Sequence, residues 1–213
     1  LCCQTKINLM EKNTLKKGFT IAEFIISIAI LSFLTYTVSI FQRDVFSLST
    51  NLQSSLNAQL EARHLIKNMI AELRRATVSA NGSYPIELAS STGITFYSDI
   101  NNNGTVERVR YYLHNKTIRK GVIAPTGNPA VYNSGSEVTT TLLNYVIASS
   151  TLPIFQYYSS NYSGTTSPIS MPPNISTIRL IKVTVIIDTD PNRSPTPIIS
   201  TSQVNLRNLK DNL

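Results

Sequence analysis

The stretch that decides the fold reads KKGFTIAE at residues 16–23 and continues as FIISIAILSFLTYTVSIF at residues 24–41. Gly18 separates a short basic segment from the apolar run, and a single acidic residue, Glu23, lies where that run begins. A carboxylate at membrane depth is costly unless it finds a partner. We therefore expect Glu23 to serve a function.

Residues 24–41 predict a membrane-spanning helix. The segment contains 18 residues and no charge. At about 1.5 Å per residue it is about 27 Å long as a helix, close to the thickness of a bilayer core. Lysines precede the segment and few basic residues follow it directly, so we expect a single-pass protein with a cytoplasmic N-terminus and an outer C-terminal domain.

The helix is expected to continue well beyond the membrane, because residues 19–80 contain neither glycine nor proline and the first break is the NGSYP sequence at 81–85. We predict a transmembrane part at 19–43 and an amphipathic part at 44–80, with the helix ending near residue 79. Eight apolar residues of the second part recur near one helix face, which we expect to pack on a sheet. They are Val45, Leu48, Leu52, Leu56, Leu60, Ile66, Ile70 and Leu73.

Residues 81–213 predict a β-rich domain. Alternating or β-branched segments favour strands, and the turn-rich DINNNG sequence at 99–104 favours a hairpin between the first two. The expected strands are Ile94–Ser98, Val106–Leu113, Thr117–Val122, Ile154–Tyr158, Ile175–Ile187 and Ile198–Leu209. Residues 138–147 are compatible with a strand or a short helix, and 124–136, 159–174 and 188–197 indicate loops. The fold class is therefore α+β, with one long helix on an antiparallel sheet.

Residues 18–31, GFTIAEFIISIAIL, closely resemble the start of type IV prepilins, the family that includes pilins and the pseudopilins of type II secretion. The resemblance implies that prepilin peptidase cleaves between Gly18 and Phe19 and that Phe19 is then N-methylated. Residues 1–18 would be the leader, with Lys16 and Lys17 as its charge next to the cut. Because Met10 would give a leader of normal length, we expect residues 1–9 to be an over-extended start.

The same resemblance implies an assembly role for Phe19, Thr20 and Glu23. After cleavage, the carboxylate of Glu23 would neutralise the new amine at Phe19 of a neighbouring subunit, and the alternative partner of Glu23 is the N-terminus of its own helix. The implied fold is pilin-like. The implied partners are prepilin peptidase, other pilin or pseudopilin subunits and the assembly platform of the inner membrane, from which the subunit would enter a filament.

A finer similarity links the hairpin region 96–113 and the segment 204–209 to minor subunits related to the J-type pseudopilin. The sequence does not separate a pilus from a secretion pseudopilus. The hydroxyl residues of the apolar span either line contacts between helices or bond to their own backbone. They are Ser27, Ser32, Thr35, Thr37 and Ser39.

Catalysis has little support in the sequence. Both cysteines, Cys2 and Cys3, precede the expected cut, which excludes a disulfide framework in the mature chain. The histidines are His64 and His114 alone, and no phosphate loop or metal-ligand spacing is present. We therefore expect a structural protein without a cofactor.

Two weaker motifs lie in the hairpin and the predicted strand that follows it. Asp99, Asn101, Asn103 and Glu107 have the spacing of the first part of a calcium loop, although Arg110 stands where that loop needs its last acidic ligand, so a plain turn is the alternative. A cluster of basic residues beside tyrosines would suit a DNA-binding or adhesive tip subunit, or else the solvated face of a sheet. This cluster comprises Arg108, Arg110, Arg119 and Lys120. The net charge of +7 decides little, because residues 1–18 contribute +3 of it.

Overall fold

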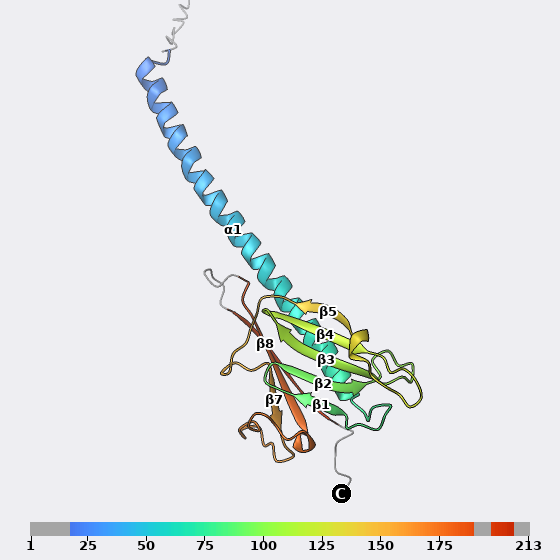
Figure 1. The fold of residues 1–213 in the computed structure, drawn as a ribbon. Coiled ribbons are helices and arrows are strands. Elements are labelled where there is room, and N and C mark those ends of the chain that lie inside the picture. Colours follow the sequence, from blue (N-terminus) through green and yellow to red (C-terminus); the bar gives the residue numbers. More distant parts are fainter. Residues whose placement is uncertain (1–17, 190–196, 207–213) are drawn as a thin grey trace, which may run out of the picture. The chain divides into compact units, whose positions relative to one another are not determined.

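The computed structural model describes residues 18–189 and 197–206 and shows an α+β protein, as the sequence predicts (Figure 1). One long helix is followed by strands that form two antiparallel sheets. The chain divides into two compact units, Leu1–Ser49 and Thr50–Leu213, with the division falling inside the helix. Both sheets and the helix segment that packs on them belong to the second unit.

The helix α1 comprises Ile21–Arg74, so it ends five residues before the predicted position. Its last turn tightens, because the amides of Arg75 and Ala76 donate to carbonyls three residues earlier, at 3.1 Å each. The amide of Thr77 then donates to the carbonyl of Tyr97 at 2.9 Å. The chain therefore leaves the helix to bond with a strand, a long-range interaction that the helix-compatible sequence of 75–80 does not reveal.

The first sheet has the strand order β1-β2-β3-β4-β5, all antiparallel, and appears in green to yellow in Figure 1. Its strands are β1 Ile86–Ala89, β2 Gly93–Ser98, β3 Glu107–His114, β4 Thr117–Ile123 and β5 Val138–Leu143. The hairpin of β2 and β3 is confirmed, whereas β1 was not predicted. The ambiguous residues 138–147 form strands: Tyr145, at φ +60°, separates β5 from the short β6.

The second sheet is built around β8, Leu180–Ile187. Strand β9, Ile198–Asn205, pairs along one edge of β8, and the short strands β6, Val146–Ile147, and β7, Phe155–Tyr158, pair with β8 as well. The prediction of a strand from Ile175 was wrong for its first residues. Ile175–Thr177 form a 3-10 turn, because the side chain of Asn174 caps it by accepting from the amide of Ser176. Residues 207–209 of the predicted last strand lie outside the described residues.

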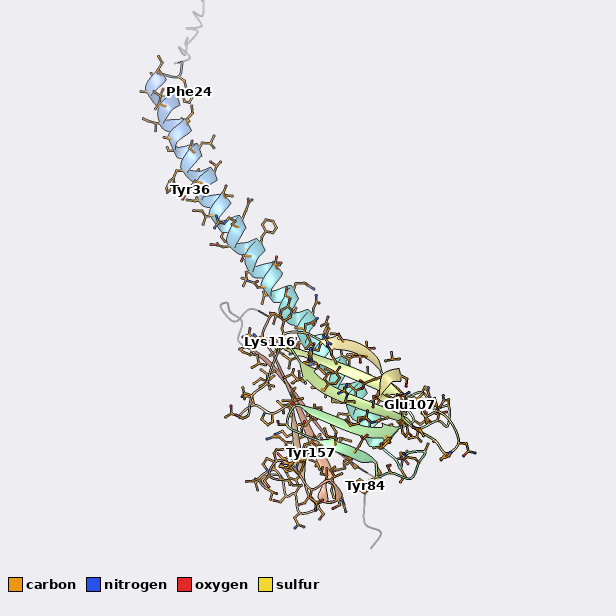
Figure 2. The ribbon with its side chains drawn as sticks, viewed as in Figure 1. Phe24, Tyr36, Tyr84, Glu107, Lys116 and Tyr157 are labelled. Atoms are coloured by element: carbon orange, nitrogen blue, oxygen red, sulfur yellow. The ribbon has the colours of Figure 1, made fainter. Side chains whose placement is uncertain are left out.

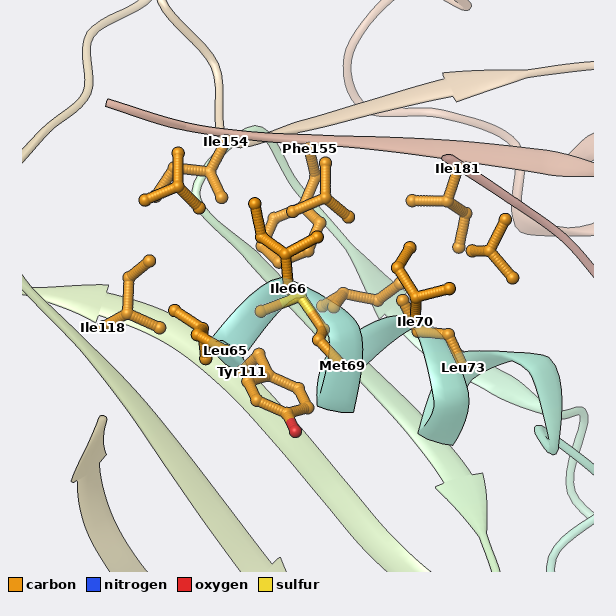
Figure 3. Packing of buried hydrophobic residues seen from close by; sticks show 14 of the residues in the cluster. Leu65, Ile66, Met69, Ile70, Leu73, Tyr111, Ile118, Ile154, Phe155 and Ile181 are labelled. Carbon is orange, nitrogen blue, oxygen red and sulfur yellow. The ribbon is translucent and has the colours of Figure 1, made fainter. Parts of the chain in front are cut away.

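Part of the helix lies between the two sheets (Figure 3). On one side Leu65 is directed toward Tyr111 and Ile118 of the first sheet. On the other side Ile66 is directed toward Phe155 of the second sheet. Burial on both sides makes this segment the centre of a single hydrophobic cluster.

The prediction of which helix face packs on the sheet was only partly right. Ile66, Ile70 and Leu73 are buried, whereas the five preceding members of the predicted stripe are exposed, from Val45 at 45% to Leu60 at 63%. The buried positions of α1 begin at Ala58, and they are Ala58, Ala62, Leu65, Ile66, Met69, Ile70 and Leu73. Small alanines allow the strands to approach the helix closely, and counting only large apolar residues overlooked them.

Candidate functional site

The expected cleavage site lies in exposed chain just before the helix. Gly18, Phe19 and Thr20 are exposed and precede the first helical residue, Ile21. Apart from the residues directly bonded to Gly18, no atom of the described chain lies within 4 Å of the position where a side chain on Gly18 would begin. Residues 1–17 of the expected leader, including Lys16 and Lys17, lie outside the described residues.

Glu23 and Thr20 form a reciprocal cap at the start of α1. The Glu23 carboxylate accepts hydrogen bonds from the Thr20 amide at 2.9 Å and from the Thr20 hydroxyl at 3.0 Å, both at Oε2. The Thr20 hydroxyl in turn accepts from the Glu23 amide at 3.3 Å. This is the capping-box arrangement, which satisfies amides that a helix start leaves without partners. Glu23 thus contacts its own helix start in the single chain, the alternative that the sequence left open.

The first part of α1 is long and apolar enough to cross a membrane, and none of its most apolar window of residues is buried. Phe24 and Tyr36, labelled in Figure 2, are 61% and 65% exposed and project outward from the helix. Large apolar side chains exposed around a whole helix need a lipid or protein environment. By its length and composition, this part of the helix could therefore span a membrane.

The hydroxyl residues of the apolar segment bond to their own helix. Ser27 donates to the Glu23 carbonyl at 2.7 Å, and Ser39 donates to the Thr35 carbonyl at 2.7 Å. Ser32, Thr35 and Thr37 donate to carbonyls three or four residues earlier in the same way. With their hydroxyls satisfied internally, these small side chains fit an apolar environment and leave space for another helix to approach.

The candidate calcium loop is held together by its own hydrogen bonds. The Asp99 carboxylate accepts from the amides of Asn103 and Gly104, at 3.2 and 2.9 Å. Glu107, labelled in Figure 2 and 4% exposed, accepts from the Ile100 amide and the Asn101 side chain, each at 3.1 Å. The carboxylates thus stabilise the turn directly. Within the described residues no group of three or more His, Cys, Asp or Glu side chains is arranged to hold a metal ion.

Two arginines of the candidate nucleic-acid cluster are neutralised on the outer face of the first sheet. Arg108 donates to both carboxylate oxygens of Glu87, at 2.6 and 3.0 Å. Arg110 donates to both oxygens of Glu137, at 2.9 and 2.6 Å, and lies over the ring of Tyr112 at 4.1 Å. In each bidentate pair, two guanidinium N–H groups that could bind a phosphate are already bonded to a carboxylate.

The pair of Arg108 and Glu87 is reflected in shifted pKa values. Burial would raise the pKa of Glu87, but the hydrogen bonds from Arg108 and Tyr97 outweigh it, and the net pKa is lowered. The hydrogen bond to Glu87 raises the pKa of Arg108. Burial, followed by the hydrogen bond to Glu87, raises the pKa of Tyr97 to about 12. Glu87 is therefore held as a carboxylate and its two partners in their protonated forms.

Lys120 points to the opposite face of the sheet and joins a network that sequence reasoning missed. Its ammonium lies 2.5 Å from the carboxylate of Glu72 on α1, which also accepts from the Tyr111 hydroxyl at 2.7 Å. Burial raises the pKa of Tyr111, and the nearby Glu72 raises it further. The hydroxyl of Ser98 donates to the Glu72 carbonyl at 3.1 Å. A signal existed in the sequence, since Glu72 falls between the buried positions Met69 and Leu73.

Arg119 is the remaining member of the cluster. It faces Tyr112 across the β3–β4 pair, and its buried Nε has no hydrogen-bond partner within the described chain. The four basic residues therefore do not form one continuous surface, because Lys120 lies on the other face and two of the arginines are paired.

Compared with known proteins, the chain matches no family model and no curated protein. The residues of the molecule themselves therefore carry the functional argument.

Proposed function

We propose that this protein is a filament subunit, a minor pilin or pseudopilin that is stored in the inner membrane and cleaved after Gly18 by a prepilin peptidase. The observation that carries the proposal is the Thr20–Glu23 cap, which lies at the exposed start of an unburied apolar helix and directly after the GF junction. The sequence around Gly18 supports the same conclusion.

Assembly would use Oε1, the oxygen of the Glu23 carboxylate that Thr20 does not contact. Both bonds from Thr20 go to Oε2, and Oε1 accepts no hydrogen bond from the described residues. Cleavage creates a positive amine at Phe19, which on a neighbouring subunit can approach Oε1. In a low-dielectric surrounding such a pair is strong when it is well placed and costly when it is not, so it favours one docking position.

The apolar helices would then bundle in the filament core, and the β-rich domains would form its outer surface. The inner-membrane platform and other subunits are the partners that this mechanism requires. The assignment to a minor subunit, of a pilus or of a type II secretion pseudopilus, rests on the J-type resemblance of the hairpin and on the long loops of the outer domain, including 159–174.

Processing is tested by intact mass and N-terminal sequencing of the protein recovered from cells with and without the prepilin peptidase. The proposal requires a chain that begins with methylated Phe19 in the first strain and a longer, unmethylated chain in the second. Recovery of the same uncleaved chain from both strains would reduce the protein to a membrane-anchored β-rich domain.

The role of Glu23 is tested by Glu23→Ala and Glu23→Gln, with Glu61→Gln, an exposed glutamate of the same helix, as the matched control. Both Glu23 variants should be cleaved but should appear in sheared filaments at a small fraction of the wild-type level. The Glu61→Gln protein should be incorporated normally. Normal incorporation of Glu23→Gln would eliminate the charge-neutralisation mechanism.

A further inference from the structure

A groove with a basic rim lies between the second half of α1 and strand β9. Its volume is about 440 Å³. The helix supplies three cations to it, and the strand lines it with three residues, of which Ser200 and Ser202 share one face while Thr201 lies on the other. These residues are Arg63, Lys67, Arg74, Ser200, Thr201 and Ser202. Ile66, Ile70 and Ala71 complete the lining, and among the described residues that line the groove none is acidic or aromatic.

The three cations lie on one face of the helix. At 3.6 residues per turn, Arg63, Lys67 and Arg74 fall within an arc of about 40°, and they are separated along the axis by about 6 and 10 Å. Each is exposed. None of the three forms an ion pair in the part of the chain that the structure describes. They therefore make an ordered row of positive charge whose donors are available.

This row contrasts with the hairpin, where the sequence suggested a basic surface. Arg108 and Arg110 are engaged by carboxylates, and Lys120 is engaged by Glu72. Within the described residues, three of the four basic residues of the predicted cluster are thus engaged, whereas the three cations of the helix row are not. Counting basic residues in the sequence does not reveal this, because Arg63 and Lys67 resemble the solvated face of an ordinary helix.

We propose that this groove binds the phosphodiester backbone of nucleic acid. Phosphate oxygens accept hydrogen bonds from Arg, Lys and Ser side chains, the donors that the helix and the strand bring to the two sides of the groove. A row of cations suits a ligand whose charges repeat along a chain. Because the described part of the chain places no aromatic ring in the groove lining, bases find no stacking platform on these residues. Binding is therefore independent of base sequence and falls steeply with salt.

The proposal does not depend on the filament function, since it concerns residues 63–74 and 200–202 and not the N-terminal cap. The groove, and not the basic residues of β3 and β4, is the nucleic-acid site that we propose. Acidic proteins and anionic lipids carry negative charge as well, so the experiment includes both.

The test uses the full chain in nanodiscs of neutral lipid and a fluorescently labelled single-stranded oligonucleotide, with anisotropy recorded from about 50 to 200 mM salt. The double variant Arg63→Gln/Lys67→Gln should raise Kd about tenfold or more at the lowest salt. The magnitude of the slope of log K against log salt should fall by roughly 1.4, about 0.7 for each phosphate that the variant no longer neutralises. The charge-matched control Lys116→Gln/Arg119→Gln, on the hairpin, should leave Kd within about twofold.

Several results would overturn the proposal. One is equal weakening by both double variants, which would mean that only net charge matters. Others are unchanged binding by the groove variant and absence of binding at the lowest salt. Competition by polyglutamate that equals competition by unlabelled oligonucleotide, charge for charge, would assign the groove to an acidic protein. If the protein floats with anionic vesicles but does not bind the oligonucleotide, the groove would be assigned to a membrane surface.

Discussion

The carboxylate of Glu72 on α1 and the ammonium of Lys120 on β4 lie 2.5 Å apart across the helix–sheet interface. Their side chains are only 12% and 16% exposed, and the Tyr111 hydroxyl completes the coordination of the carboxylate. When an ion pair is removed from water to this degree, replacing one partner is strongly destabilising. Replacing both partners with apolar residues costs much less stability. We therefore expect the pair to fix the position of the helix on the first sheet more than it adds stability.

Removing one partner of this pair should be worse than removing both. Lys120→Met leaves the largely buried Glu72 side chain without its ion-pair partner, and we expect it to lower the free energy of unfolding by about 2–4 kcal/mol. The double variant Glu72→Leu/Lys120→Met should lose less than the single one. Urea unfolding of the full chain in micelles, followed by tyrosine fluorescence, measures both.

The control for this pair is Lys116→Met, an exposed lysine in the adjacent turn, which should change stability by less than about 0.5 kcal/mol. The single variant Glu72→Leu completes the comparison. If the double variant loses as much stability as Glu72→Leu and Lys120→Met together, the two residues act independently, and the interpretation as one coupled pair is wrong.

Truncating leucines on the two faces of α1 should have very different effects. Leu65 is 4% exposed and belongs to the core cluster, so Leu65→Ala should cost about 2–4 kcal/mol. Leu56 is 55% exposed, and Leu56→Ala should cost less than about 0.5 kcal/mol in the monomer. The same unfolding experiment compares them. A large loss for Leu56→Ala would restore the sequence-based assignment of its face to the core.

The elements that the sequence predicted well are those with a local signal. The uninterrupted helix, the hairpin around residues 99–104 and the strand at 117–122 follow from periodicity and turn residues alone. The Thr20–Glu23 cap has a local signal as well, the threonine and the glutamate three residues later. Where the signal is local, the neighbouring residues already determine the backbone.

The errors of the prediction come from interactions between distant parts of the chain. The helix ends at Arg74 because the Thr77 amide hydrogen-bonds to Tyr97 of β2, and the residues near position 75 do not predict that hydrogen bond. Lys120 was grouped with Arg119 by sequence, although neighbouring residues of a strand point to opposite faces. The pairing of Arg110 with Glu137 joins residues 27 positions apart. Such contacts are set by the register of the sheet, which a single sequence does not specify.

Gly121 leaves the space that the Arg110–Glu137 pair occupies. A Cβ on Gly121 would overlap the Glu137 carboxylate, which would have to move away from the arginine. Gly121→Ala should therefore lower the free energy of unfolding by about 1 kcal/mol, the contribution of a well-oriented ion pair near the surface. In a Glu137→Ala background the same substitution should cost little, because the obstructing carboxylate is absent. An equal cost in both backgrounds would place its origin elsewhere.

The Glu87–Arg108 pair predicts a loss of stability in acid. The folded-state pKa of Glu87 lies below its ordinary value of 4.5, so its contribution is present above about pH 4.5 and is lost as the pH falls through the lower folded-state value. Glu87→Gln should be less stable than the wild type at neutral pH, and the gap should narrow below pH 4.5. Thermal melting at a series of pH values measures it. A gap that does not change with pH would assign the effect of Glu87 to packing.

The turn at residues 99–107 should be stable without calcium. Asp99 already accepts two backbone amides, and Glu107 accepts two further donors, so the donors of the chain satisfy the carboxylates that a cation would need. A ligand that binds only the folded state raises the free energy of unfolding by RT ln(1 + [L]/Kd), so a calcium concentration well below Kd leaves the melting temperature unchanged. Calcium at about 1 mM should therefore move the melting temperature by less than about 1 °C relative to a chelator. Asp99→Asn should cost about 1 kcal/mol in either solution, since it weakens the two amide bonds. A calcium-dependent rise in the wild type that Asp99→Asn abolishes would show instead that the loop binds the ion.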